Sequence, residues 1–197
     1  LNIMGGTHAT ASREFLLPNA FNAKHTKMLK DAVNIPVFIG HNIFSPEDAE
    51  KMLAEGNADF VALGRSQLAD PAWAKKAKEG RASDIKPCIN CLIGCIDRGM
   101  LSHTPIHCTV NPSLYRFECK PVEKAETRKQ VAVVGAGPTG CEAALTASKR
   151  GHQVTIYEKR CIGGAMIEAS KPENKANIKR LIHYYEDHIM HDPNITL

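Results

Sequence analysis

The sequence predicts an α/β protein in which parallel strands alternate with helices. Short apolar runs that end in glycine recur before capped helices in residues 1–80, and a dense group of cysteines follows in residues 81–128. In residues 129–197 a glycine-rich turn joins an apolar run to a helix. Repetition of strand, glycine loop and capped helix is typical of parallel α/β units. We therefore expect three parts with these boundaries.

The first part contains two strand signals, each followed by a helix signal. The expected elements are strands 35–39 and 59–63 and helices 46–56 and 72–79. Ser45 is placed to cap the first helix and Pro46 to occupy its first turn, while Asp70 is placed to cap the second. These signals favour the C-terminal part of a (β/α)8 barrel, whose loops after the last strands bind phosphate.

Two glycine loops follow these expected strands and are candidates for that phosphate site. Backbone N–H groups beside glycine and one guanidinium suit a doubly charged anion. The candidate residues are Gly40, His41, Asn42, Gly64 and Arg65. The alternative is that both glycines simply end strands and that Arg65 is a surface charge. A barrel takes about 250 residues, so we expect its first strands to lie outside this chain, which we interpret as an internal fragment.

Four cysteines lie close together in the middle of the chain. They are Cys88, Cys91, Cys95 and Cys108, with spacings of two, three and twelve residues. Three thiolates in a short loop and a fourth from a separate loop suit a [4Fe–4S] cluster. Structural zinc is the alternative, although its ligands usually come as two separated pairs. The remaining cysteines are interpreted as small buried residues: Cys119, Cys141 and Cys161.

A glycine-rich turn marks the start of the third part. The expected order is a strand at 130–134, the turn at 135–140, a helix at 141–150, a second strand at 153–157 and an acidic residue at 158. Gly135 makes the tight turn, Gly137 lets the backbone approach a diphosphate, and Gly140 lets the helix pack closely on the strand. Pro138 belongs to the same motif. The pattern predicts a Rossmann-like dinucleotide-binding domain.

The acidic residue after the second strand bears on which dinucleotide is bound. The Glu158 carboxylate is placed to accept hydrogen bonds from ribose hydroxyls, and it would repel the 2′-phosphate of NADP. Lys159 and the later Gly164 favour FAD, and NAD remains the alternative. Near the end of the chain, an amphipathic helix is expected over 179–191, with the apolar side chains of Leu181, Ile182, Tyr185 and Ile189 on one face.

Composition excludes several classes of function. The net charge is only +4 and no basic run alternates with aromatic residues, so nucleic acid is not an expected partner. No apolar run approaches the roughly 20 residues that cross a bilayer, so no membrane association is expected. With four of seven cysteines assigned to a metal cluster, the sequence favours a reducing cytoplasm.

The order of these motifs resembles the iron–sulfur flavoproteins of the NADH:flavin oxidoreductase family, which includes 2,4-dienoyl-CoA reductase, trimethylamine dehydrogenase and enoate reductases. The resemblance implies FMN in the barrel, a [4Fe–4S] cluster beside it and an FAD domain reduced by NAD(P)H. It implies that Gly40 to Asn42, Gly64 and Arg65 hold the FMN phosphate. It also implies that His8 orients or polarises the substrate, although the family's Trp-His-Glu setting is Thr-His-Ala here.

The implied reaction is reduction of an activated C=C bond in a 2-enoate, dienoyl-CoA or enone. Electrons would pass from NAD(P)H through FAD and the cluster to FMN. The proton donor is expected in the missing strands, so the fragment alone is expected to be inactive. The alternatives are amine dehydrogenation of the trimethylamine dehydrogenase type and a non-enzymatic electron-transfer module. The implied partners are NADH or NADPH, a small unsaturated substrate and a second copy of the chain.

Overall fold

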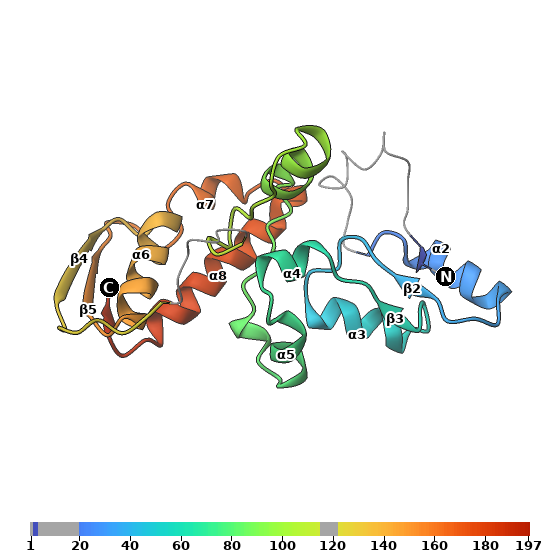
Figure 1. Ribbon diagram of the computed structural model, residues 1–197, viewed down its shortest axis with the longest axis horizontal. Helices are drawn as coiled ribbons and strands as arrows, with labels where there is room; N and C mark the ends of the chain where they lie inside the picture. Colours follow the sequence, from blue (N-terminus) through green and yellow to red (C-terminus); the bar gives the residue numbers. More distant parts are fainter. Residues whose placement is uncertain (1, 4–19, 115–121) are drawn as a thin grey trace. The chain divides into compact units, whose positions relative to one another are not determined.

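The computed structural model describes residues 2–3, 20–114 and 122–197 and divides into two compact units (Figure 1). The first unit is Leu1–Leu114 and the second is Tyr115–Leu197. Each unit contains a three-stranded parallel sheet with helices between its strands. The chain is therefore an α/β protein, as predicted. No helix in the parts described is both long and apolar enough to cross a membrane.

The sheet of the first unit is formed by very short strands. They are β1 (Asn2–Ile3), β2 (Phe38–Ile39) and β3 (Phe60–Val61), in the order β1-β2-β3. The predicted strands 35–39 and 59–63 were too long. One reason is that Val37 donates its N–H to the Asp59 carboxylate at 2.9 Å, whereas a regular strand would donate it to a neighbouring backbone carbonyl.

The described residues of the first unit form six helical elements. They are α2 (Ala23–Ala32), α3 (Pro46–Ala54), α4 (Arg65–Ala69), α5 (Trp73–Lys78), the 3-10 turn η2 (Ala82–Asp84) and the π-helical η3 (Ile93–Leu101). Of these, the sequence indicated only α3 and α5. The Ser45 cap of α3 is confirmed, because its Oγ accepts the Asp48 N–H at 3.1 Å. Helix α3 ends two residues before Gly56, which adopts a φ of +67°.

The core of the first unit lies between its sheet and helices. Its buried side chains include Ile39, Ile43, Met52, Trp73 and Ile85. Asp70 is buried at the start of α5, where it accepts hydrogen bonds from the Ala72 amide at 3.0 Å, the Lys76 ammonium at 2.6 Å and the Lys86 amide at 3.0 Å. Burial alone would raise the pKa of the Asp70 carboxyl, but these hydrogen bonds hold the pKa below its ordinary value.

The second unit repeats the alternation of strand and helix. Its elements are β4 (Gln130–Val134), α6 (Pro138–Lys149), β5 (Gln153–Tyr157), α7 (Met166–Ala169), the 3-10 turn η4 (Glu173–Lys175), α8 (Ala176–Met190) and β6 (Ile195–Thr196). Both predicted long strands are confirmed to the residue. Helix α6 begins at Pro138 instead of Cys141, because Gly137 serves as its N-cap and proline suits a first helical turn.

Helix α6 packs on β4 and β5, and α8 packs on α6 and β6 (Figure 1). The apolar face predicted for α8 is confirmed, because all four of its predicted side chains are buried: Leu181, Ile182, Tyr185 and Ile189. The helix begins three residues earlier than predicted, at Ala176. The Tyr185 hydroxyl donates a hydrogen bond to the Glu142 carboxylate at 2.9 Å, which joins α8 to α6.

We expect Asp70→Asn to lower the free energy of unfolding of the first unit by about 2 kcal/mol, because it removes the charge that Lys76 contacts. The side chain of Trp73, the chain's single tryptophan, is buried in α5, so its fluorescence in a urea titration measures the change. Asp31→Asn is the control. It breaks an exposed pair with Lys27 and should change stability by less than about 1 kcal/mol.

The same substitution should alter acid sensitivity. Because the folded-state pKa of Asp70 is lowered, its contribution is fully present above the unfolded pKa of about 3.9 and is lost as the pH falls through the folded value. The Asp70→Asn protein should therefore lose less stability on acidification than the original protein, because it has no carboxylate at this position to protonate. Equal unfolding midpoints for the variant and the original at neutral pH would contradict this assignment.

Candidate functional site

A cavity of about 370 Å3 opens where β2 and β3 of the first unit end. The carboxyl ends of parallel strands meet at one edge of a sheet, which is where α/β proteins bind ligands. All five residues predicted to hold phosphate line this cavity: Gly40, His41, Asn42, Gly64 and Arg65. The two glycine loops therefore lie together, although 24 positions separate Gly40 from Gly64 in the chain.

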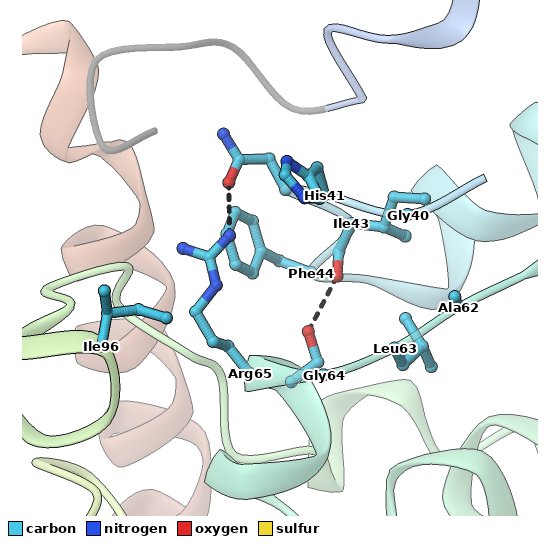
Figure 2. Close-up of a pocket in the computed structure, with 11 residues that line it drawn as sticks. Gly40, His41, Ile43, Phe44, Ala62, Leu63, Gly64, Arg65 and Ile96 are labelled. Carbon is cyan, nitrogen blue, oxygen red and sulfur yellow. Dashed lines mark hydrogen bonds between the residues drawn. The ribbon is translucent and has the colours of Figure 1, made fainter. Parts of the chain in front are cut away.

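Arg65 has a defined position in this cavity. Its Nη2 donates to the Asn42 Oδ1 at 2.9 Å, and its guanidinium carbon lies 5.7 Å from the centre of the Phe44 ring (Figure 2). The nearby Ser66 hydroxyl donates to the Ile43 carbonyl at 2.8 Å and holds the two loops together. A guanidinium fixed in this way is suited to bind an anion in a bidentate manner.

The four clustered cysteines line a second cavity of the first unit. Its wall contains Cys88, Cys91, Cys95 and Cys108, the apolar side chains of Leu68, Leu92 and Val110, and Arg65. The structure thus brings together all four predicted metal ligands. Among the residues that the structure describes, no group of three or more His, Cys, Asp or Glu side chains is arranged to hold a single metal ion.

Backbone geometry shapes the loop that carries these cysteines. Asn90 and Leu92 adopt left-handed conformations, with φ of +54° and +61°, so the chain turns sharply on both sides of Cys91. Gly94 then accepts the His107 N–H at 2.8 Å. A Cβ on Gly94 would lie 2.4 Å from the His107 carbonyl oxygen. Glycine is therefore required at this position, and the contact brings the segment of Cys95 against that of Cys108.

The thiols lie in surroundings of different polarity. Burial raises the pKa of Cys88 to about 12, although the Asn90 amide, 3.4 Å from its sulfur, and the charge of Arg65 act in the opposite direction. Burial also raises the pKa of Cys95. The Cys91 sulfur lies 3.1 Å from the Thr109 hydroxyl. Bound iron favours the thiolate form of such residues, and the donor set of four thiols in one cavity fits an iron–sulfur cluster.

The glycine-rich turn of the second unit joins β4 to α6. Gly135 has a φ of +91°, and a Cβ on Gly140 would lie 1.9 Å from the Gly135 carbonyl oxygen, so both positions require glycine. A Cβ on Gly137 would meet nothing within 4 Å. The backbone there faces open space next to the N-terminus of α6, where N–H groups favour an anion. Pro138 is the first residue of that helix.

A second turn lies beside the first. The Gly163 N–H donates to the Ala136 carbonyl at 2.8 Å, and a Cβ on Gly164 would lie 3.0 Å from the Gly137 Cα. Glu158 follows β5 and accepts hydrogen bonds from the Ala136 amide at 2.8 Å and the Arg160 amide at 2.9 Å. These bonds, led by that from Ala136, lower the pKa of the Glu158 carboxyl.

Several predictions concerned single residues outside these two groups. Lys159 is exposed beside Glu158, and its backbone adds to the effect of the Ala136 amide in lowering the pKa of the Glu158 carboxyl. Cys141 is buried as predicted, and its thiol donates to the Ala136 carbonyl at 3.3 Å. The prediction was wrong for Cys161, which is exposed in the turn after β5. His8 and Cys119 lie outside the residues that the structure describes.

Sequence reasoning missed the contacts between the two glycine loops and the cysteine loop. Arg65 lines both cavities, Ile96 of η3 lines the first, and Asn90 accepts a hydrogen bond from the Arg65 Nη1. Arg65 and Asn90 are 25 positions apart, and no periodic pattern relates them. The sequence shows an asparagine inside the cysteine motif, but nothing in the sequence names its partner.

Both units match families of known proteins. Residues 9–84 match the NADH:flavin oxidoreductase / NADH oxidase family, and residues 115–185 match the pyridine nucleotide-disulphide oxidoreductase family. An NADH oxidase of Thermoanaerobacter brockii is 50% identical over 153 residues, which cover 77% of this chain and 24% of that protein.

Two solved structures are similar to the chain. A 2-naphthoyl-CoA reductase in complex with 2-naphthoyl-CoA is 33% identical, with a TM-score of 0.86, and the match covers 93% of this chain and 28% of that one. A histamine dehydrogenase of Rhizobium sp. 4-9 is 28% identical, with a TM-score of 0.82, and the match covers 92% and 27%. The chain spans about a quarter of the length of these relatives. By these matches, the first unit of the chain is similar to the NADH:flavin oxidoreductase / NADH oxidase family and the second to the pyridine nucleotide-disulphide oxidoreductase family.

Proposed function

We propose that this chain is part of an NAD(P)H-dependent flavin and iron–sulfur oxidoreductase that reduces an activated C=C bond. The observation that carries the proposal is that Arg65 lines both the cavity at the ends of β2 and β3 and the cavity of the four cysteines. The cavity of the two glycine loops and the cavity of the cysteine loop thus share Arg65 as part of their walls. This supports an FMN and a [4Fe–4S] cluster as neighbours, as electron transfer between them requires.

The first unit would hold two of the cofactors. In this proposal it is the C-terminal part of a (β/α)8 barrel, and the loops at Gly40 to Asn42 and at Gly64 and Arg65 hold the FMN phosphate. The guanidinium supplies a fixed positive charge, and the glycines leave backbone N–H groups accessible. The four clustered thiols would hold the iron–sulfur cluster: Cys88, Cys91, Cys95 and Cys108. His8 is proposed to orient the substrate.

The second unit would hold FAD in a Rossmann-like domain. Gly135, Gly137 and Gly140 shape the turn, the N-terminus of α6 faces the diphosphate, and Glu158 accepts hydrogen bonds from the adenosine ribose. Lys159 and Gly164 flank this site. When bound, the three cofactors would supply hydride acceptance, one-electron transfer and hydride delivery to the substrate.

A specific similarity favours a second candidate function. The histamine dehydrogenase matches this chain with a TM-score of 0.82, close to the 0.86 of the 2-naphthoyl-CoA reductase. The same cofactor arrangement would serve amine oxidation if electrons left the flavin through the cluster. The direction of electron flow therefore separates the two candidates.

The experiment is anaerobic reduction of the full-length protein with NADH or NADPH, followed by unsaturated acids, their CoA esters, enones and, separately, amines. We expect a pyridine nucleotide to bleach the flavin absorption and an unsaturated compound to restore it. Bleaching by an amine, with no response to either nucleotide, would instead establish the amine dehydrogenase. Metal analysis of the same sample should find iron and acid-labile sulfide, and zinc without sulfide would overturn the cluster assignment.

Cysteine substitutions provide a second test. Cys95→Ser should lower the retained iron and sulfide by at least about tenfold. Replacing a residue that only supports a metal ligand typically weakens metal binding by about tenfold or more, and replacing the ligand itself should cost at least as much. Cys161→Ser is the matched control, since that thiol is exposed and lies in the other unit, and it should retain the full content. Equal iron in the two variants would refute the ligand set.

Two glycines of the dinucleotide turn should respond differently to alanine. Gly137→Ala should weaken FAD binding by at least about tenfold, because the new methyl group occupies the space where the diphosphate approaches the backbone. The unfolding free energy should change by less than about 0.5 kcal/mol, because nothing lies near that methyl group.

Gly140→Ala should instead destabilise the unit by about 2 kcal/mol, because its methyl group overlaps the Gly135 carbonyl. Flavin titration and urea unfolding separate these effects, and normal FAD affinity in Gly137→Ala would contradict the site.

A further inference from the structure

Asn90 is a buried amide inside the cysteine motif, between Cys88 and Cys91. Its exposed fraction is 5%, so its polar side chain is held almost entirely within the protein. Its Oδ1 accepts a hydrogen bond from the Arg65 Nη1. A buried amide is retained at low cost only where its oxygen and nitrogen have partners. The contact between Asn90 and Arg65 is therefore part of how the cysteine loop is built.

The backbone of Asn90 has a separate task. Its φ of +54° is left-handed, a conformation that asparagine adopts more readily than most residues. Its N–H points to the Cys88 sulfur, at 3.4 Å. One residue thus bonds a candidate cluster ligand through its main chain and a candidate phosphate ligand through its side chain. Any shift of the loop would move both contacts together.

Arg65 is held from both sides. Asn42, in the loop after β2, accepts from Nη2 at 2.9 Å, while Asn90, in the cysteine loop, accepts from Nη1. Both acceptors are amides, which orient the guanidinium without adding a formal negative charge. Phe44 lies against the guanidinium, with its ring centre 5.7 Å away, and limits its movement (Figure 2). The arginine is therefore positioned by one amide from the loop after β2 and one from the cysteine loop.

We propose that Asn90 is a positioning residue that couples the two cavities, so that an anion bound at Arg65 and the folded cysteine loop stabilise each other. The inference rests on the proposed function, in which the cavity at the ends of β2 and β3 takes the FMN phosphate. Coupling of this kind is reciprocal: if the ordered loop strengthens anion binding, anion binding must strengthen retention of what the loop holds.

The first experiment compares FMN with riboflavin, which lacks the phosphate, in titrations of the deflavinated full-length protein. Asn90→Gly removes the amide and keeps the left-handed backbone accessible. We expect this variant to bind FMN about tenfold more weakly, the effect of losing one hydrogen bond to a charged group, with riboflavin binding unchanged. Asn111→Ala is the control. Asn111 lies three residues after Cys108 and donates to the Leu68 carbonyl, so its loss should leave the preference for FMN unaltered.

The second experiment measures the reciprocal effect with inorganic phosphate as the probe. Phosphate, compared with chloride at equal ionic strength, should slow the release of iron to a chelator from the original protein. In Asn90→Gly that protection should disappear. Asn90→Asp keeps an acceptor and places a negative charge beside Arg65, so it should retain iron and still lose the preference for FMN. If Asn90→Gly does not fold, the preference of Asn90→Asp for FMN over riboflavin tests the coupling in its place.

The outcomes separate this inference from the function on which it rests. If the original protein binds FMN and riboflavin equally, the phosphate assignment itself fails. If the original protein prefers FMN and both Asn90 variants keep that preference, the phosphate assignment stands and the coupling through Asn90 is overturned. Protection of iron by phosphate that persists in Asn90→Gly would overturn it as well.

Discussion

The close approach of Gly94 to His107 is the constraint on which the cysteine cavity depends. The backbone bond of 2.8 Å between them joins the end of the short cysteine loop to the segment that brings Cys108. Only a residue without a Cβ permits this approach. Without it, three thiols would lie on one segment and the fourth elsewhere, and no shared cavity would form. The contact with Arg65 in turn depends on this loop, because Asn90 reaches the guanidinium only from its left-handed position.

The two units share one local arrangement, a glycine between the end of a parallel strand and the start of a helix. In each, parallel strands end at a loop where glycine leaves backbone groups accessible, and a helix begins immediately afterwards. Gly64 precedes α4 in the first unit, and Gly137 precedes α6 in the second. The difference lies in the source of positive charge. The first unit adds a guanidinium held by side chains, whereas the second relies on the N–H groups of a helix of twelve residues.

Features that depend on local chemistry were predictable from the sequence. Ser45 and Pro46 indicated the start of α3, and the runs 130–134 and 153–157 gave β4 and β5 their observed bounds. The steric need for glycine at Gly140 followed from its motif. Helix α6 was placed three residues too late because the glycine motif was read as a loop up to its end.

Features that depend on distant contacts were not predictable. The strands of the first unit are shorter than their apolar runs because Asp59 takes the Val37 N–H. The π-helical geometry of η3 was not predictable, because the apolar and polar residues of this segment show no spacing that distinguishes i to i+5 hydrogen bonding from an ordinary helix. The link between Arg65 and Asn90 joins residues far apart in sequence, and only the folded chain identifies it.

In the proposed FAD site, the hydrogen bonds that Glu158 already accepts would set the net energy of ribose recognition. Both carboxylate oxygens already accept backbone amides, one from the glycine turn itself and one from Arg160. A sugar bound there would share or replace existing partners of this carboxylate, and the enthalpy it gained would be the difference between two sets of similar bonds. Discrimination among nucleotides at the proposed site would then come more from what the carboxylate repels than from what it attracts.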